Sequence, residues 1–196
     1  MPSETSVGIL ALQGDFLEHS KLLKVLNVEV IEVRNSQQLA EVDSLIIPGG
    51  ESTTIAKLID VYNLRQPIIE FAQKGSPVWG TCAGMILLAG SLVETEPSPL
   101  KLMNTVVQRN AFGRQVNSFS TELEFEGIRD GLFEAIFIRA PHVVSANNGV
   151  KILSKLIDGT IVAVRENNLL ATAFHPELTR DARIHEYFVQ MTKGTI

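Results

Sequence analysis

The first half of the chain alternates two hydrophobic rhythms. Short β-rich runs occur at VGILAL (7–12), VEVIEV (28–33) and SLII (44–47). In the last run, consecutive apolar residues place hydrophobic side chains on both faces of the strand. Between the first two lies FLEHSKLLKVL (16–26), whose apolar residues recur at helical spacing. Strands that alternate with helices are typical of βαβ units, so this half predicts a parallel sheet covered by helices.

The rhythm changes after residue 90, where the helical spacing is lost and shorter strand-like pieces follow. VKILSKLI (150–157), TIVAVRE (160–166) and LLATAFH (169–175) are separated by the turn signals DG and NN, which predicts an antiparallel meander. The last segment predicts a helix after a capping Thr179, with Ile184, Phe188 and Met191 on one face. The whole pattern therefore predicts an α/β fold with a mostly parallel sheet and a small antiparallel extension.

The amino-acid composition is typical of a globular protein and disfavours several other classes. With 196 residues, 45% of them hydrophobic, we expect a single globular domain over residues 1–196. A net charge of −5 without basic runs disfavours nucleic acid, and no apolar stretch is long enough for a membrane span. One cysteine and four scattered histidines exclude an internal disulfide and do not suggest a metal site, so we expect a reducing, cytoplasmic location.

The single cysteine lies in the segment GSPVWGTCAGMILLAG (75–90). A strand ending near Trp79, followed by Gly80-Thr81-Cys82-Ala83-Gly84 and a helical run, matches the small-x-nucleophile-x-Gly turn of a nucleophile elbow. Small residues suit such a turn because larger side chains would collide with neighbouring strands. The helix that follows favours a thiolate at Cys82 through its unpaired N–H groups. The alternative is a buried cysteine that only fills the core.

A thiol nucleophile also needs a base, and the end of the last predicted strand offers one. His175 follows Phe174, and Glu177 comes two residues later; on an extended backbone, the two side chains point to the same side. We therefore expect Glu177 to orient His175 toward Cys82. A second strand-to-glycine junction, IIPGGESTT (46–54), suggests that the N–H groups of Gly50 and Ala83 form an oxyanion hole, although PGGEST can also be a simple capped turn.

Six segments together carry a resemblance to a known family. They resemble the class I, or triad-type, glutamine amidotransferases, and among these the glutaminase subunits of pyridoxal 5'-phosphate synthases. The fold that the resemblance implies is flavodoxin-like and doubly wound, with helices on both faces of the sheet. The segments are LALQGDFLEH (10–19), IIPGGESTT (46–54), GTCAGMILLA (80–89), RNAFGRQVNSF (109–119), FIRAPH (137–142) and FHPELT (174–179).

The resemblance also implies roles for individual residues. Cys82 would be the nucleophile, His175 the general base and acid, and Glu177 the orienting carboxylate, with no metal and no cofactor. The residues implied to bind glutamine are Gly50, Glu51, Ser52, Arg109, Ile138 and Arg139. A cationic fork suits the substrate carboxylate and a carboxylate suits its ammonium group, while a structural ion pair is the alternative for both arginines.

Three further residues receive no catalytic role. The role of Arg114 stays open, His185 is expected on the terminal helix, and His19 is expected on a helix surface.

The implied activity is hydrolysis of L-glutamine to L-glutamate and ammonia through a thioester. The implied partner is a (βα)8 synthase subunit that uses the ammonia to make pyridoxal 5'-phosphate, in a large heteromeric assembly. We expect the docking surface to include Gln13-Gly14 and the face that bears Cys82. Two alternatives remain at this stage: a glutaminase that serves histidine or purine biosynthesis, and a non-catalytic binding module on the same fold.

Overall fold

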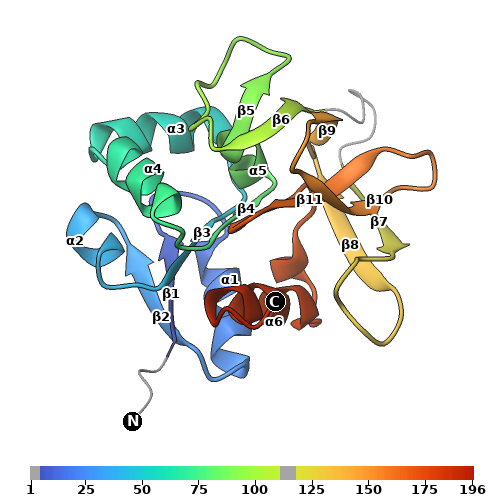
Figure 1. The fold of residues 1–196 in the computed structure, drawn as a ribbon, viewed down its shortest axis with the longest axis horizontal. Coiled ribbons are helices and arrows are strands. Elements are labelled where there is room, and N and C mark those ends of the chain that lie inside the picture. The colour runs from blue at the N-terminus through green and yellow to red at the C-terminus, as the bar shows by residue number, and fades with distance from the viewer. Residues whose placement is uncertain (1–4, 111–117) are drawn as a thin grey trace.

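A computed structural model describes residues 5–110 and 118–196. Its main sheet has ten strands in the order β2-β1-β3-β4-β12-β11-β9-β6-β5, with β10 paired to β11 (Figure 1). The strands are β1 (Ser6–Leu10), β2 (Glu29–Val33), β3 (Ser44–Ile47), β4 (Val78–Thr81), β5 (Ala89–Leu92), β6 (Met103–Gln108), β7 (Ser118–Leu123), β8 (Phe133–Ile138), β9 (His142–Ala146), β10 (Lys151–Lys155), β11 (Ile161–Glu166) and β12 (Leu169–Thr172).

Five neighbouring strands form the doubly wound part of this sheet. The pairs β2–β1, β1–β3, β3–β4 and β4–β12 are all parallel. The resulting order β2-β1-β3-β4-β12 is that of a flavodoxin-like sheet, with β12 supplying the fifth strand from the far end of the chain. The predicted flavodoxin-like, mostly parallel sheet is therefore confirmed.

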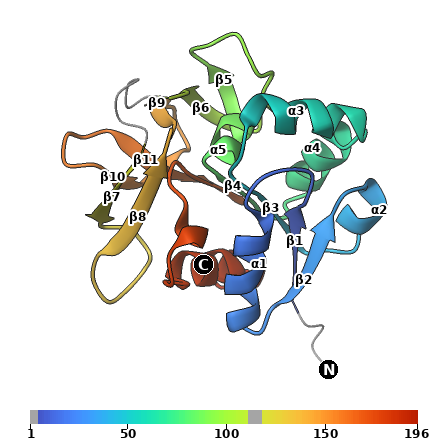
Figure 2. The same cartoon turned by 180° about the vertical axis from the view of Figure 1, so that it is seen from behind.

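Helices cover both faces of the parallel strands. Helices α1 and α6 lie on one face and α3, α4 and α5 on the other, as the two opposite views show (Figures 1 and 2). The helices are α1 (Phe16–Val25), α2 (Ser36–Leu39), α3 (Ser52–Val61), α4 (Arg65–Gln73), α5 (Ala83–Leu88) and α6 (Arg183–Thr192). Among the described residues, no helix has the length and apolar character needed to cross a membrane.

The antiparallel extension continues from the parallel strands. The pairs β10–β11 and β11–β12 are antiparallel, which confirms the predicted meander. Strands β9, β6 and β5 extend the sheet beyond β11, and β7 and β8 form a separate two-stranded sheet. Because β12 belongs both to the meander and to the parallel sheet, the extension is tied directly to the strand that precedes His175.

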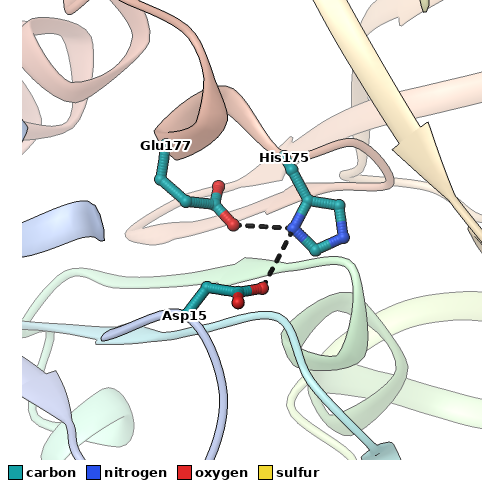
Figure 3. A group of neighbouring side chains, drawn as sticks. All are labelled: Asp15, His175 and Glu177. Carbon is teal, nitrogen blue, oxygen red and sulfur yellow. Dashed lines mark hydrogen bonds and ion pairs between the residues drawn. The ribbon is translucent and has the colours of Figure 1, made fainter. Parts of the chain in front are cut away.

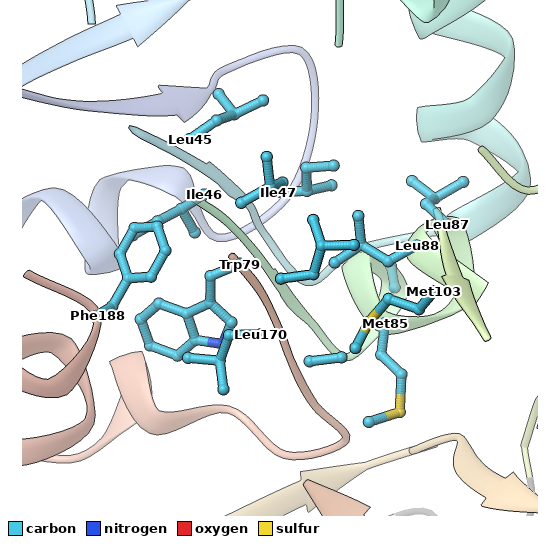
Figure 4. Close-up of a cluster of buried hydrophobic side chains, with 14 of the residues drawn as sticks. Leu45, Ile46, Ile47, Trp79, Met85, Leu87, Leu88, Met103, Leu170 and Phe188 are labelled. Carbon is cyan, nitrogen blue, oxygen red and sulfur yellow. The ribbon is translucent and has the colours of Figure 1, made fainter. Parts of the chain in front are cut away.

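A continuous apolar core fills the space between the sheet and its helices. Trp79, in the central strand β4, has no exposed surface and packs beside Phe188 of α6, with 5.5 Å between the ring centroids (Figure 4). Its indole N–H donates to Thr172 Oγ1 over 3.1 Å, so the one polar atom of this ring is satisfied. The core therefore fixes β4 against β12 immediately below the loops that follow them.

Two expectations at the helices were wrong. The terminal helix begins at Arg183, with Ala182 at its N-cap position, whereas Thr179 ends a 3-10 turn at Pro176–Leu178. Arg183 donates to the carboxylate of Asp181 at this start, which explains a helix that begins three residues later than a cap at Thr179 predicts. His19 is fully buried between α1 and the sheet and is not a surface residue.

Candidate active site

The candidate site lies at the carboxyl edge of the parallel strands, where such sheets bind ligands. The loops that follow β1, β3, β4 and β12 carry Asp15, Gly49-Gly50, Cys82 and His175 respectively. The first two loops lie directly against each other, because the Asp15 N–H donates to the Gly49 carbonyl over 3.0 Å. Four segments far apart in sequence therefore meet at one edge.

Cys82 occupies a strained turn between β4 and α5. Its φ of 47° lies in the left-handed region that non-glycine residues rarely adopt. A methyl group on Gly80 would lie 2.3 Å from the Gly84 carbonyl carbon, and one on Gly84 would lie 2.2 Å from the Ile47 carbonyl oxygen. The two glycines are therefore required by close backbone contacts, as the predicted nucleophile elbow demands.

The register between β4 and β12 brings His175 close to Cys82. Thr81 pairs with Thr172, and the Cys82 N–H donates to the Thr172 carbonyl over 2.8 Å. His175 follows three residues after Thr172, and its own N–H donates to the Ile136 carbonyl of β8 over 2.8 Å. Cys82 and His175, 93 positions apart in the sequence (175 − 82), thus follow neighbouring strands of one sheet.

His175 is held by two carboxylates. Its Nδ1 donates to Glu177 Oε1 over 2.6 Å and lies 3.4 Å from Asp15 Oδ2 (Figure 3). The predicted pairing of His175 with Glu177 is present, but not for the predicted reason. The segment Pro176–Leu178 is a 3-10 turn and not extended, so the turn folds the carboxylate back onto the imidazole.

Burial and hydrogen bonding shift the pKa values of His175 and Glu177 in opposite directions. Burial favours the neutral ring of His175, but its hydrogen bonds with Asp15, Cys82 and Glu177 raise its pKa overall. Burial raises the pKa of Glu177, while the hydrogen bond and charge of His175 act in the opposite direction. The arrangement stabilises an imidazolium beside the cysteine, which is the form that can protonate a leaving amine.

A cavity of about 430 Å³ opens above the cysteine, within the size range of small-molecule sites. Its wall brings together every residue predicted for catalysis or substrate binding except Glu177, which lies buried behind His175. The lining residues are Asp15, Gly50, Glu51, Ser52, Cys82, Ala83, Ile86, Arg109, Asn110, Ile138, Arg139 and His175.

Glu51 and Arg109 form one polar side of the cavity. Glu51 caps α3 by accepting hydrogen bonds from the N–H groups of Thr53 and Thr54. Burial acts to raise the pKa of Glu51, but these hydrogen bonds and those of the two threonine hydroxyls lower it to about 2. Arg109 Nη1 donates to the Glu96 carbonyl over 2.7 Å, and Nη2 lies 3.7 Å from Glu51 Oε1. Both residues have structural partners and still line the cavity.

The end of β8 forms another part of the cavity wall. Cys82 Sγ lies 3.8 Å from the Ile138 carbonyl oxygen, and the next residue, Arg139, has a φ of 44°. A second strained residue therefore lies beside the first at the same cavity, as is common at functional sites. Ala83 is the first residue of α5, so its N–H has no partner within the helix.

Asp15, His175 and Glu177 are also the one group of side chains, among residues 5–110 and 118–196, whose geometry suits a metal ion. Nδ1 of His175 is occupied by its hydrogen bond to Glu177, which leaves no lone pair for a metal at that atom. Arg114 and the surrounding residues 111–117 lie outside the described residues.

Sequence reasoning missed two features of the site. Asp15 was not considered, although it directly precedes α1 in the loop after β1. His19 lies at 2.8 Å from His185 and 3.5 Å from Glu177, behind the triad. Its position, three residues after Phe16 and four before Leu23, lies on the apolar stripe of α1 and was a signal that it faces inward.

Comparisons with known proteins agree with this geometry. The profile of the SNO glutamine amidotransferase family matches residues 9–194. A pyridoxal 5'-phosphate synthase subunit PdxT from Dehalococcoides mccartyi is 58% identical over 95% of this chain and 97% of its own length. Another protein of that name, from Herpetosiphon aurantiacus, is 53% identical over 94% of this chain and 98% of its own.

Solved structures give the same picture at the level of the fold. A crystal structure described as a glutamine amidotransferase superposes with a TM-score of 0.90 at 46% identity, covering 95% of this chain and 98% of that one. PurLQS from Thermotoga maritima superposes with a TM-score of 0.70 at 13% identity, over 95% of this chain and 97% of that one. The second likeness concerns the fold alone.

Proposed function

This chain belongs to the SNO glutamine amidotransferase family, and from that premise we propose that Cys82, His175 and Glu177 hydrolyse L-glutamine in its cavity. It is the glutaminase subunit of a pyridoxal 5'-phosphate synthase, and the relatives above are named as subunits of that synthase. The observation that carries the proposed chemistry is the convergence of a strained cysteine, a doubly supported histidine and a buried carboxylate at one sheet edge.

The first half of the reaction forms a thioester. The thiolate of Cys82 attacks the side-chain amide carbon of glutamine, and the carbonyl oxygen takes up negative charge. The N–H groups of Gly50 and Ala83 are proposed to stabilise that oxyanion. As the tetrahedral intermediate collapses, the carbon–nitrogen bond breaks and the imidazolium of His175 gives its proton to the departing nitrogen, which leaves as ammonia.

The second half restores the enzyme. His175, now neutral, removes a proton from a water molecule that attacks the γ-glutamyl thioester. The carbon–sulfur bond breaks, the sulfur leaves as the thiolate, and L-glutamate is released while His175 keeps the proton. Glu177 holds Nδ1–H throughout, so the Nε2 atom of the ring stays directed at the reacting groups.

Substrate contacts are proposed for the polar walls of the cavity. The guanidinium groups of Arg109 and Arg139 suit the α-carboxylate of glutamine, and Glu51 remains ionised to pair with its α-ammonium group. Ser52 and Ile138 complete the walls on either side of Cys82. Each of these residues lines the same cavity as the nucleophile, which supports the assignment.

The chain acts with a synthase partner, and we propose that the partner docks at the face that bears the cavity. Ammonia is mostly protonated near neutral pH and is then no nucleophile, so it is useful only when released beside its acceptor. Gln13 lies at that face, since its side-chain oxygen accepts from the Glu51 N–H over 3.0 Å. A (βα)8 partner, a large assembly and a cytoplasmic setting are part of the same proposal.

The test measures ammonia and glutamate release from L-glutamine while a pyridoxal 5'-phosphate synthase subunit is titrated in. Cys82→Ala should lose essentially all turnover but still bind glutamine, because the sulfur forms the covalent bond and does not hold the substrate. Lys24→Ala, on the exposed side of α1, is the control and should match the wild type. Wild-type turnover by Cys82→Ala would refute the nucleophile, and a rate unaffected by saturating synthase would refute the coupling.

A non-catalytic binding module predicts a different result. A chloroketone analogue of glutamine should label Cys82 in the wild type and should not label the Cys82→Ala protein. Absence of labelling in an intact, glutamine-binding wild type would favour the binding module.

A further inference from the structure

Two buried histidines form a row behind the triad, on the side away from the thiol. His19 in α1 and His185 in α6 both have no exposed surface. His185 Nε2 lies 2.8 Å from His19 Nδ1, and His19 Nε2 lies 3.2 Å from Thr81 Oγ1 and 3.5 Å from Glu177 Oε2. The row thus ends on the carboxylate that orients His175.

The partners of these atoms determine where each ring carries its proton. His185 Nδ1 is buried without a hydrogen-bond partner in the described structure, so it is the bare nitrogen, because an unpaired buried N–H is the rarer and costlier case. The proton of His185 is therefore on Nε2 and is donated to His19 Nδ1. Since Nδ1 of His19 accepts, the proton of His19 is on Nε2, which lies within hydrogen-bond distance of Thr81 Oγ1 and 3.5 Å from Glu177 Oε2.

Both rings are kept neutral by their surroundings. Burial lowers the pKa of His185 to about 3, and burial with the nearby charges of His185 and His175 lowers that of His19 well below its usual value. The charged and titratable groups that face Glu177 are His175, Asp15 and His19. A neutral donor on this side adds no charge that would compete with His175 for the carboxylate.

Glu177 Oε2 needs such a donor. This atom is buried, and no hydrogen bond reaches it in the described structure, while Oε1 accepts from His175. A buried carboxylate with one hydrogen bond is prone to take up a proton, and a protonated Glu177 would hold the imidazole less well. His19 Nε2 lies 3.5 Å from Oε2, a separation longer than an ideal hydrogen bond.

We propose that His19 is a positioning residue for the glutaminase reaction: its Nε2–H, shared with Thr81, keeps Glu177 ionised and oriented, and His185 selects the tautomer that makes this possible. The inference rests on the proposed function, because its effect on rate passes through Glu177 and His175. His19 does not line the cavity, so it should influence turnover and leave glutamine binding nearly unchanged.

Two substitutions separate a donor from a ring that only packs. His19→Gln keeps an N–H near the position of Nε2, whereas His19→Phe keeps the ring that lies 5.5 Å from Trp79 and loses both polar atoms. In the complex with a synthase subunit, we expect His19→Phe to lower kcat about tenfold, with KM within about twofold of wild type. His19→Gln should recover most of that loss.

The rate of Cys82 alkylation by iodoacetamide at neutral pH gives a second readout on the isolated chain. It should fall with kcat in His19→Phe and recover in His19→Gln, because a weakly held His175 stabilises less thiolate. If Phe preserves kcat and alkylation while Gln loses them, the role of His19 is packing alone and the inference is wrong.

Imidazole ¹⁵N spectra of the wild type test the tautomers without any substitution. Both His19 and His185 should show a protonated Nε2 and a bare Nδ1 near neutral pH. A protonated Nδ1 on His19 would make His19 the donor to His185, which reverses the direction of this hydrogen bond and overturns the inference. A wild type without glutaminase activity would contradict the proposed function instead, and the tautomer result would still decide the direction of the row.

Discussion

Gly49 leaves the space in which the imidazole of His175 lies. A methyl group at this position would be 2.4 Å from His175 Cε1, 2.9 Å from Nδ1 and 3.2 Å from Asp15 Oδ2. The backbone of the loop after β3 therefore forms the surface against which the ring packs. In the sequence, Gly49 could be read as an ordinary turn residue, but the site requires a glycine here because any side chain would collide with His175.

We expect Gly49→Ala to lose activity while the fold remains intact. The added methyl group must displace the ring of His175 or its carboxylate partners, and a misplacement of about 1 Å costs on the order of 100-fold in rate. Glutaminase rate and urea unfolding, measured side by side, check this. Lys24→Ala is the control, since Lys24 is exposed on α1. Near-normal activity of Gly49→Ala would mean that the loop moves freely.

At the scale of elements, the elbow depends on how closely α5 approaches the sheet. Gly84 brings the first turn of this helix to the Ile47 carbonyl of β3, and Gly80 brings β4 to the same turn. The thiol is consequently presented by a helix that packs on the backbone of two strands. The short 3-10 turn after β12 has the same function for Glu177, which it returns to the ring of His175.

Gly84→Ala should therefore destabilise the fold as well as the site. Its methyl group would lie 2.2 Å from a carbonyl oxygen of a central strand, and overpacking of this kind costs about 1–3 kcal/mol. The free energy of unfolding in urea measures the loss, with Lys24→Ala, on the exposed side of α1, expected within about 0.5 kcal/mol of wild type. An unfolding free energy equal to that of wild type would show that α5 can slide away from β3 without cost.

At the scale of the whole molecule, His19 and His185 link α1, α6 and the sheet through two buried polar contacts, one between the two rings and one from His19 to Thr81. The ring of His185 also lies 4.9 Å from that of Trp79, so the polar row is embedded in the aromatic part of the core. Both histidines have a pKa below that of an unfolded chain, so unfolding takes up protons below about pH 6.5.

The free energy of unfolding should consequently fall as the pH decreases from about 7 to about 5. Each ring contributes up to roughly 1.4 kcal/mol per pH unit below its unfolded pKa, and the contribution of His185 ends near its folded pKa of about 3. His175, with a raised pKa, acts in the opposite window, above about pH 6.5. Urea unfolding over this range should show a smaller slope for His185→Phe. An identical slope would mean that His185 is protonated in the folded chain.

The pattern of residues was enough to predict the βαβ half, the meander and the elbow, because hydrophobic spacing and glycine placement reflect local conformation. It also pointed to Cys82, His175 and Glu177, since each stands beside a recognisable strand end; the structure brings the three together, and their catalytic roles stay a prediction. It failed at Thr179, where an ion pair between Asp181 and Arg183 determines the helix start. It missed Asp15 and misplaced His19, because no local rule tells which polar side chain meets a distant partner.

The amino-acid sequence by itself determined the strands, the helices and the chemical groups at their ends. Only the tertiary structure decided which of these groups meet, because strand order and register are set by packing over the whole sheet. The parallel pairing of β4 with β12 brings Cys82 to His175, and the burial of α1 and α6 sets a neutral histidine pair behind Glu177. Residues far apart in the sequence become neighbours only when the strands and helices pack around one core, so no single segment predicts which of them meet.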